Sequence, residues 1–135
     1  MPATIHRRLR PACLLALGAL FALPVGAADR VRAGQWETTL HVAGHAMTKS
    51  VCLSQSDADA INGDANSIRM YAEKTGAPAG CKVTDVKVNG NQVSVKSVCA
   101  SGKENSGTTT YHGTSFESVN TNGAKAESKW VGACK

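Results

Sequence analysis

The histidines are the first residues in this chain whose spacing suggests chemistry. His41 and His45 lie four residues apart, the spacing of two metal ligands on one helix face, and His112 follows later in the chain. The first two, however, flank Ala43-Gly44, a tight-turn sequence between two strand-like segments, and a closed metal site needs three or four placed ligands. We therefore predict exposed histidines at strand ends, and neither a bound metal nor another cofactor.

Acidic and hydroxyl side chains do not form a catalytic pattern. Between residues 57 and 64, three aspartates and one asparagine resemble a calcium-binding loop, but Ile61 and Ile68 occupy two of the positions that need oxygen ligands. The Thr108-Thr109-Thr110 run supplies hydroxyls without a nucleophile-elbow motif. Nothing selects a pair of glutamates for glycoside hydrolysis. We assign no catalytic residue and expect a protein that is not an enzyme.

Residues 1–28 have the three parts of a secretory signal peptide. A basic start without acids precedes an apolar run, Ala12–Leu23, and small residues follow at positions 24–28. The apolar run is shorter than the ~20 residues that span a membrane. We predict cleavage after Ala27 or Ala28, export to the periplasm or beyond, and a product that is not embedded in the membrane.

Removal of residues 1–28 changes the charge of the chain. The segment contains three of the 15 Lys and Arg residues and none of the 10 acids, which leaves 12 basic residues against 10 acidic ones in a single domain, residues 29–135. No basic block or stripe remains. Binding to nucleic acid is therefore not expected.

The cysteines indicate disulfides and not redox catalysis. Cys13 lies in the predicted signal peptide, and an even number remains: Cys52, Cys81, Cys99 and Cys134. No two are spaced as in a CxxC motif, which argues against a thioredoxin-like site or a zinc ribbon. Exported proteins meet an oxidising compartment, so we predict two structural bridges.

The elements that must position these cysteines are mainly strands. We predict about six antiparallel strands in a meander that forms a sheet, a half-barrel or a barrel. A helical insertion spans Ser54–Thr75, and Asn62-Gly63-Asp64 divides it into two short helices if the break signal holds. The predicted strands are Trp36–Val42, Ala46–Cys52, Lys82–Val88, Gln92–Cys99, Thr108–Phe116 and Ala124–Val131.

The clearest hairpin is built around Asn89-Gly90-Asn91. A three-residue loop places Cys81 opposite Cys99, whereas a loop of Asn89-Gly90 alone shifts the register by one residue. Val83 and Val86 do not share a strand face unless a bulge lies near Thr84-Asp85. The predicted core combines inward strand positions with one helix face: Trp36, Val83, Val95, Phe116 and Trp130 with Ile61, Ile68 and Tyr71.

The pairing of the four cysteines stays open between two arrangements. In a six-strand meander all four fall at one end of the sheet. A Cys52–Cys81 bridge would close the base of the helical insertion and leave Cys99–Cys134, and we favour this arrangement. The alternative joins Cys81 to Cys99 across the hairpin and Cys52 to Cys134.

Several short motifs recur in an order that resembles a known family. They are Gly34-Gln35-Trp36-Glu37, Cys52-Leu53, Cys81 and Cys99 around the hairpin, Tyr111–Phe116, and Trp130–Cys134. Together they resemble the bacterial secreted family known as domain of unknown function 3617, over essentially the whole chain after residue 28. The resemblance implies a small periplasmic β-domain, and it transfers no catalytic residue.

Three function classes follow from these observations. The first is a non-enzymatic exported domain that binds a small apolar ligand or an envelope partner. The second is an inhibitor module similar to the small periplasmic lysozyme inhibitors, with the polar segment Ser101–Gly107 as the loop that would enter an active-site cleft. A hydrolase comes last, because no nucleophile and base are paired.

Overall fold

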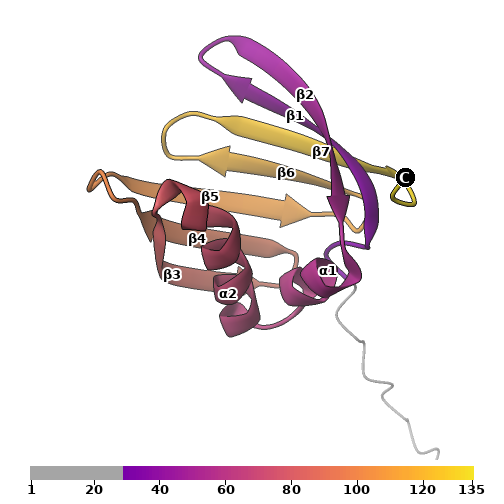
Figure 1. Cartoon of the computed structure of the whole chain (residues 1–135), viewed down its shortest axis with the longest axis horizontal. Coiled ribbons are helices and arrows are strands. Elements are labelled where there is room, and N and C mark those ends of the chain that lie inside the picture. Colours follow the sequence, from indigo (N-terminus) through magenta and orange to yellow (C-terminus); the bar gives the residue numbers. More distant parts are fainter. Residues whose placement is uncertain (1–28) are drawn as a thin grey trace, which may run out of the picture.

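The computed structural model describes residues 29–135, which form one seven-stranded antiparallel sheet and two helices (Figure 1). The predicted signal peptide, residues 1–28, lies outside the described residues. The strands are β1 Gly34–Val42, β2 His45–Leu53, β3 Lys82–Asn89, β4 Gln92–Val98, β5 Glu104–Tyr111, β6 Ser115–Asn120 and β7 Lys125–Gly132. The helices are α1 Gln55–Asn62 and α2 Ala65–Gly76, and a 3₁₀ turn follows at Ala77–Ala79.

The order of strands across the sheet is β2-β1-β7-β6-β5-β4-β3. Strands β3 to β7 form a meander, and β1 then pairs with β7, so that the first hairpin completes the sheet at the far side. The two strands that flank the helical insertion, β2 and β3, therefore lie at opposite edges. The helices cross one face of the curved sheet, and the tip of the β1–β2 hairpin extends beyond them (Figure 1). We call the face under the helices the concave face and the other the convex face.

The prediction of a mainly β domain in an antiparallel sheet is confirmed, but residues 29–135 form seven strands where about six were expected. The predicted strand Thr108–Phe116 is two strands, β5 and β6. A tight turn separates them, in which the backbone N–H of His112 donates to Ser115 O at 2.8 Å and Gly113 has a φ of +79°. The turn was missed because β-branched and aromatic residues lie on both sides of it, and such residues are typical of one continuous strand.

The polar segment Ser101–Gly107, expected to be a loop, is largely strand. Its second half is the start of β5, where Asn105 pairs with Ser97 and Gly107 with Val95 of β4. The turn that remains is short, because Cys99 N already donates to Lys103 O at 3.1 Å. Polar composition was misleading here, since strand pairing satisfies the backbone groups of polar residues as well as apolar ones.

The helical insertion is two helices, as the Asn62-Gly63-Asp64 break signal indicated. Ser54 caps α1 by accepting a hydrogen bond from Asp57 N at 3.2 Å, and Asp64 caps α2 by accepting one from Ser67 N at 2.8 Å. Each cap satisfies a backbone donor that the first helical turn leaves free. Two short helices can follow the curvature of the sheet, which one straight helix could not.

The β3–β4 hairpin combines a two-residue loop with a bulge. Asn89 pairs with Gln92, so the loop is Gly90-Asn91, which is neither of the two loops considered above. The predicted bulge is present: the register shifts between Val83 and Asp85, with Thr84 as the extra residue. The shift turns Val83 and Val86 to one face and brings Lys82 opposite Val98. Cys81 and Cys99, one residue further, then face each other.

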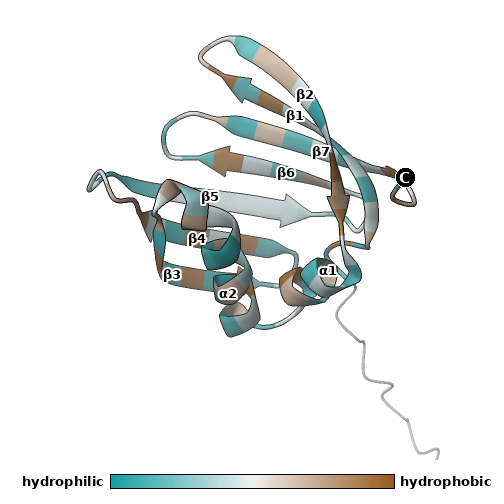
Figure 2. Cartoon of the chain, viewed as in Figure 1, coloured by the Kyte–Doolittle hydropathy of each residue, from teal (hydrophilic) through white to brown (hydrophobic). Residues whose placement is uncertain are grey.

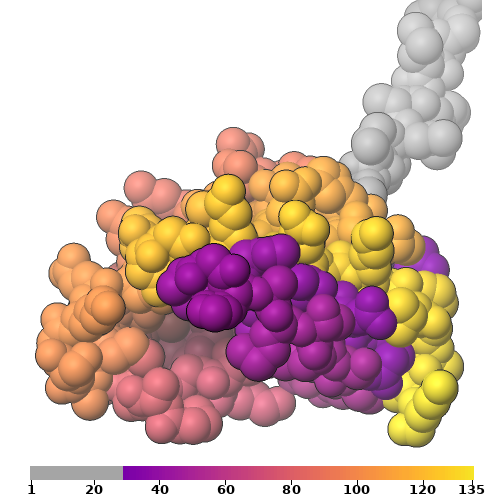
Figure 3. All heavy atoms as spheres, turned by 90° about the horizontal axis from the view of Figure 1, so that it is seen from above, coloured from indigo at the N-terminus to yellow at the C-terminus, as the bar shows by residue number. Residues whose placement is uncertain are grey.

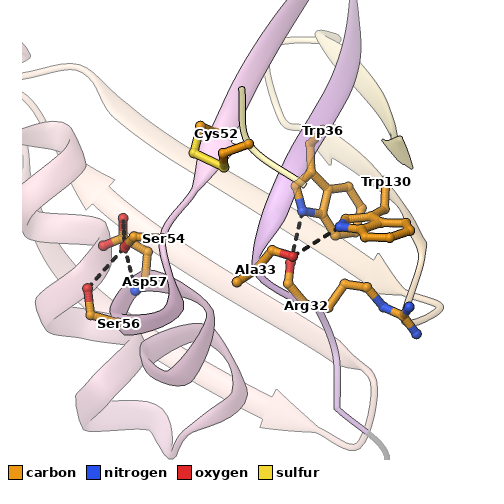
Figure 4. Close-up of a disulfide and its surroundings, with 9 residues drawn as sticks. Arg32, Ala33, Trp36, Cys52, Ser54, Ser56, Asp57 and Trp130 are labelled. Carbon is orange, nitrogen blue, oxygen red and sulfur yellow. Dashed lines mark hydrogen bonds between the residues drawn. A yellow bond between two sulfur atoms is a disulfide. The ribbon is translucent and has the colours of Figure 1, made fainter. Parts of the chain in front are cut away.

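The favoured disulfide pairing, Cys52–Cys81 with Cys99–Cys134, is wrong. The bridges are Cys52–Cys134 and Cys81–Cys99. Because β2 and β3 occupy opposite edges of the sheet, a bridge between their ends cannot close the base of the insertion. Cys52 instead pairs with Gln35 of β1, whose other neighbour is Gly132 of β7, so Cys134 lies within reach across β1 (Figure 4).

The core lies between the concave face and the helices. Trp36 and Val83 are buried as predicted, and so are Ile61 and Ile68 of the helices. The other predicted core residues, Val95, Phe116, Trp130 and Tyr71, are half-buried. Figure 2 shows hydrophobic residues interrupted by hydrophilic ones along the strands other than β5, as expected for a sheet with one covered face. Lys82, Lys87 and Lys96 are exposed, as isolated strand charges should be.

Candidate functional site

An apolar pocket of about 230 Å³ lies between the concave face and the helices. Its wall combines residues of five strands and both helices with one residue that precedes β1. The volume is slightly below the ~300–1,000 Å³ typical of sites for drug-sized ligands, so a small or slender molecule fits best. The lining residues are Val31, Trp36, Thr38, Val51, Leu53, Ile61, Tyr71, Tyr111, Phe116 and Ser128. Viewed from the hairpin side, the surface is hollowed between the β1–β2 hairpin and α2 (Figure 3).

Aromatic rings form much of this wall. The centroids of Trp36 and Phe116 are 5.5 Å apart, and those of Tyr111 and Phe116 are 5.6 Å apart, both in tilted arrangements. Such contacts hold rings in fixed positions without filling the space in front of them. Four of the five aromatic residues after position 28 line the pocket, and Trp130 packs beside it. In a chain with so few aromatics, this concentration distinguishes the site.

The segment before β1 closes one end of the pocket. Val31 is 2% exposed, and Asn62 holds it in place by bonding both its N–H, at 3.0 Å, and its carbonyl, at 2.8 Å. Arg30 donates to the carbonyls of Ile61 and Gly63. These contacts fasten the segment to the end of α1, so that the base of the pocket is rigid.

Two tryptophans fasten the same segment to the sheet (Figure 4). The indole N–H of Trp36 donates to Arg32 O, and that of Trp130 donates to Ala33 O, each at 3.0 Å. The Arg32 guanidinium lies 5.0 Å from the Trp130 ring centroid, a cation–π contact. The polar atoms of both indoles are therefore satisfied, and Trp36 presents only its apolar ring to the pocket.

One buried pair of hydroxyls belongs to the pocket wall. Thr38 and Ser128 are 8% and 3% exposed, and their hydroxyl oxygens are 2.8 Å apart. Ser128 also donates to Glu37 O at 3.3 Å. Because the two groups satisfy each other, they can be buried in the pocket wall at little cost. Within residues 29–135, no hydroxyl is hydrogen-bonded to a histidine.

Burial raises the pKa of the Tyr111 phenol to about 12. Loss of solvent around the ring is the main cause, and the neighbouring Tyr71 adds to it. Burial also raises the pKa of Tyr71, which faces the pocket from α2. Both phenols are therefore neutral at physiological pH, and neither tyrosine adds a charge to the pocket.

The family model described as protein of unknown function (DUF3617) matches residues 31–134. The chain belongs to this family. No curated protein and no solved structure matches it. The match begins at Val31, the residue that closes the pocket, and includes every residue of the pocket wall.

The short motifs that indicated the DUF3617 family meet at the pocket. Trp36, Leu53, Tyr111 and Phe116 come from three of those motifs, and all four line the wall. Sequence reasoning placed Trp36, Tyr111 and Phe116 on strands and left Leu53 just after one, but it did not bring the four residues together as a site. The missing information was the pairing of β1 with β7, which places the first motif, Gly34–Glu37, beside the last motif, Trp130–Cys134.

The histidines of this DUF3617 domain are dispersed. Successive residues of a strand alternate between the two faces, and Thr38 of β1 lies on the concave face. His41 therefore lies on the convex face, whereas His45 lies on the concave face opposite Val42. His112 is in the β5–β6 turn, with Nε2 3.7 Å from Glu117 Oε1. Among residues 29–135, no group of three potential metal ligands lies together. No helix of this part of the chain is long and apolar enough to cross a membrane.

A second recess of about 500 Å³ lies where the bulge of β3 meets β4 and β5. Its wall is polar and contains no aromatic residue: Thr84, Lys96, Ser97, Glu104, Asn105, Ser106 and Thr121. Although larger, this recess exposes as much polar as apolar surface, whereas the surface of the aromatic pocket is mostly apolar. The aromatic pocket is therefore the better candidate for binding.

Proposed function

We propose that this DUF3617 domain is a non-enzymatic binding protein that takes a small apolar ligand into the aromatic pocket. The aromatic, largely apolar and partly open wall is the observation that carries the proposal. Ligand sites are typically concave and mostly apolar, with a few polar groups that orient the ligand. The neutral phenols and the hydroxyl pair would have that second role.

The periplasm, or the space outside the cell, is the proposed location. The two disulfides support it, because such bridges persist in oxidising compartments. The signal-like residues 1–28 support it from the sequence. An apolar molecule that crosses an aqueous compartment needs a carrier or a receptor, and a domain of this kind could serve as either.

An inhibitor of lysozyme is the competing function, and the fold gives it less support. An inhibitor of that kind needs a protruding loop, and the segment considered for it, Ser101–Gly107, is largely part of β5. We expect no loss of lysozyme activity when the purified protein is added to a standard assay. Inhibition at equimolar protein would favour the competing function.

Binding of 1-decanol, an uncharged apolar probe, tests the proposal. Val51 lines the pocket yet is 39% exposed, so Val51→Phe should fill the opening without disturbing the fold. Val119→Phe is the matched control, because Val119 is 51% exposed on the convex face. We expect tryptophan fluorescence, from Trp36 in the wall and Trp130 beside it, to report saturable binding that Val51→Phe weakens at least ten-fold and Val119→Phe leaves unchanged. Equal binding by all three proteins, or no binding to the wild type, would refute the pocket as the site.

A further inference from the structure

We infer that the ligand is an amphiphile of the fatty-carboxylate class, whose negatively charged head group is held by Lys49 at the rim of the pocket. The alkyl chain would occupy the aromatic pocket. This inference rests on the proposed function and adds the chemical class of the ligand.

The two faces of the sheet differ in charge. Directly paired residues of neighbouring strands share a face, and successive residues alternate between faces. Trp36, Thr38 and Ser128 mark the concave face, since they pair across β1 and β7 and are buried. By this criterion every carboxylate of the seven strands lies on the convex face. These carboxylates are Glu37, Asp85, Glu104, Glu117 and Glu127.

Lys49 is the exception among the charged strand residues. It pairs directly with Thr38 on β1, which places it on the concave face, and Val51 of the pocket wall is two residues further along the same face. The other strand lysines, at positions 82, 87, 96, 125 and 129, share the convex face with the carboxylates. Within the seven strands, then, the concave face carries a single formal charge, and that charge is positive.

Lys49 is free to bind a ligand. It is exposed, and it takes part in none of the ion pairs among residues 29–135. A lysine can lay its four-carbon stem along apolar surface and direct its ammonium group to a nearby anion. Paired residues have Cβ atoms only ~4.5–5.5 Å apart, so the ammonium group can reach a carboxylate that lies above Thr38.

The cationic groups of the helices and of the segment before β1 do not compete with Lys49 for the same ligand head group. Lys74 and Asp57, which flank Tyr71, form an ion pair at 3.0 Å and neutralise each other. Arg30 and Arg69 donate to backbone carbonyls, which fixes their guanidinium groups within the fold. A monoanion is the charge that one unpaired lysine can balance, and a pocket of about 230 Å³ suits a single alkyl chain. Both observations favour a fatty carboxylate.

Three probes with the same alkyl chain and different head groups test this inference: decanoate, 1-decanol and decyltrimethylammonium. For the wild type at neutral pH, we expect decanoate to bind about five-fold more tightly than 1-decanol, the upper end for an exposed ion pair. The ammonium probe should bind most weakly. The preference for decanoate should decrease as salt is added, because salt screens exposed charges.

Variants of Lys49 separate the head-group contact from the pocket. Lys49→Gln should abolish the preference for decanoate over 1-decanol, whereas Lys49→Glu should reverse the order in favour of the ammonium probe. Lys125→Gln, which removes an exposed lysine from the convex face, should behave as the wild type. If 1-decanol binds in the pocket but decanoate binds no better, the inference about Lys49 is overturned and the proposed function stands. If none of the probes binds the wild type, both are overturned.

Discussion

Gly34 shows how a single backbone position can fix the end of the sheet. Its φ is +133°, and a Cβ atom at this position would overlap Gly132 O and the indole nitrogen of Trp130. We expect Gly34→Ala to lower the free energy of unfolding by about 3 kcal/mol or more, since backbone strain of ~1–3 kcal/mol adds to a steric overlap of similar cost. Urea denaturation measures the loss. Gly44→Ala is the control, because Gly44 has a φ of +81° and nothing lies within 4 Å of an added Cβ. Gly44→Ala should lower the free energy of unfolding by only ~1–2 kcal/mol. Equal losses for the two variants would contradict the steric overlap at Gly34.

Tyr111 gives the pocket a measurable titration. Its pKa rises from an ordinary value near 10 to about 12, so the folded protein keeps the phenolic proton over a pH range in which the unfolded chain loses it. Stability is therefore unaffected below pH 10 and falls as the pH rises from about 10 to about 12. Alkaline titration followed by tyrosinate absorbance should show a late step that Tyr111→Phe removes. A single step near pH 10 for both tyrosines would show that Tyr111 is not buried.

At the scale of elements, the bulge at Thr84 sets which cysteines meet. Deletion of Thr84 removes the extra residue, so that the residues before the bulge, 81–83, shift by one position relative to β4. We expect the deletion to move Cys81 away from Cys99 and to prevent their bridge. Non-reducing tryptic mapping detects the change, because cleavage at the intervening lysines separates the two cysteines. Thr84→Ala keeps the residue count and should retain the bridge, and a native bridge in the deletion variant would contradict this role for the bulge.

Local sequence signals predicted the helices, strands and bulge well, but they did not predict which strands pair across the sheet. The bulge followed from the misaligned Val83 and Val86, and the division of the helices followed from Asn62-Gly63-Asp64, because each depends on a few adjacent residues. The pairing of β1 with β7 depends on side chains about 90 positions apart, such as Thr38 and Ser128, which share a hydrogen bond across a sequence separation of 90. No local pattern encodes that pairing. The pocket and the Cys52–Cys134 bridge both depend on it, so the pocket could not be derived from the sequence and the disulfide pairing stayed open between two arrangements.

For the whole molecule, the two bridges should contribute unequally to stability. Cys52–Cys134 joins positions 82 residues apart, and Cys81–Cys99 joins positions 18 apart. In the chain-entropy model these loops correspond to about 4.5 and about 3.2 kcal/mol. We expect the double variant Cys52→Ser/Cys134→Ser to lose about 1 kcal/mol more than Cys81→Ser/Cys99→Ser in urea denaturation. Each variant serves as the control for the other, and a larger loss from the short loop would contradict the model.

The nested pairing of these cysteines also has a kinetic consequence. As the chain is synthesised, Cys52 meets Cys81 long before Cys134 exists, and oxidation in order of appearance would yield Cys52–Cys81 and Cys99–Cys134. That pattern is a trap, since it would tie together two strands that belong at opposite edges. Thiol–disulfide exchange must then undo the first bond, or the sheet must form before any bond does. Correct maturation therefore requires slow oxidation or an isomerase. Oxidation of the chain while it is being synthesised should accumulate the consecutive isomer, which a glutathione buffer then converts to the native one, whereas refolding of the complete reduced chain should form Cys81–Cys99 first, because its loop of 18 residues is the shortest.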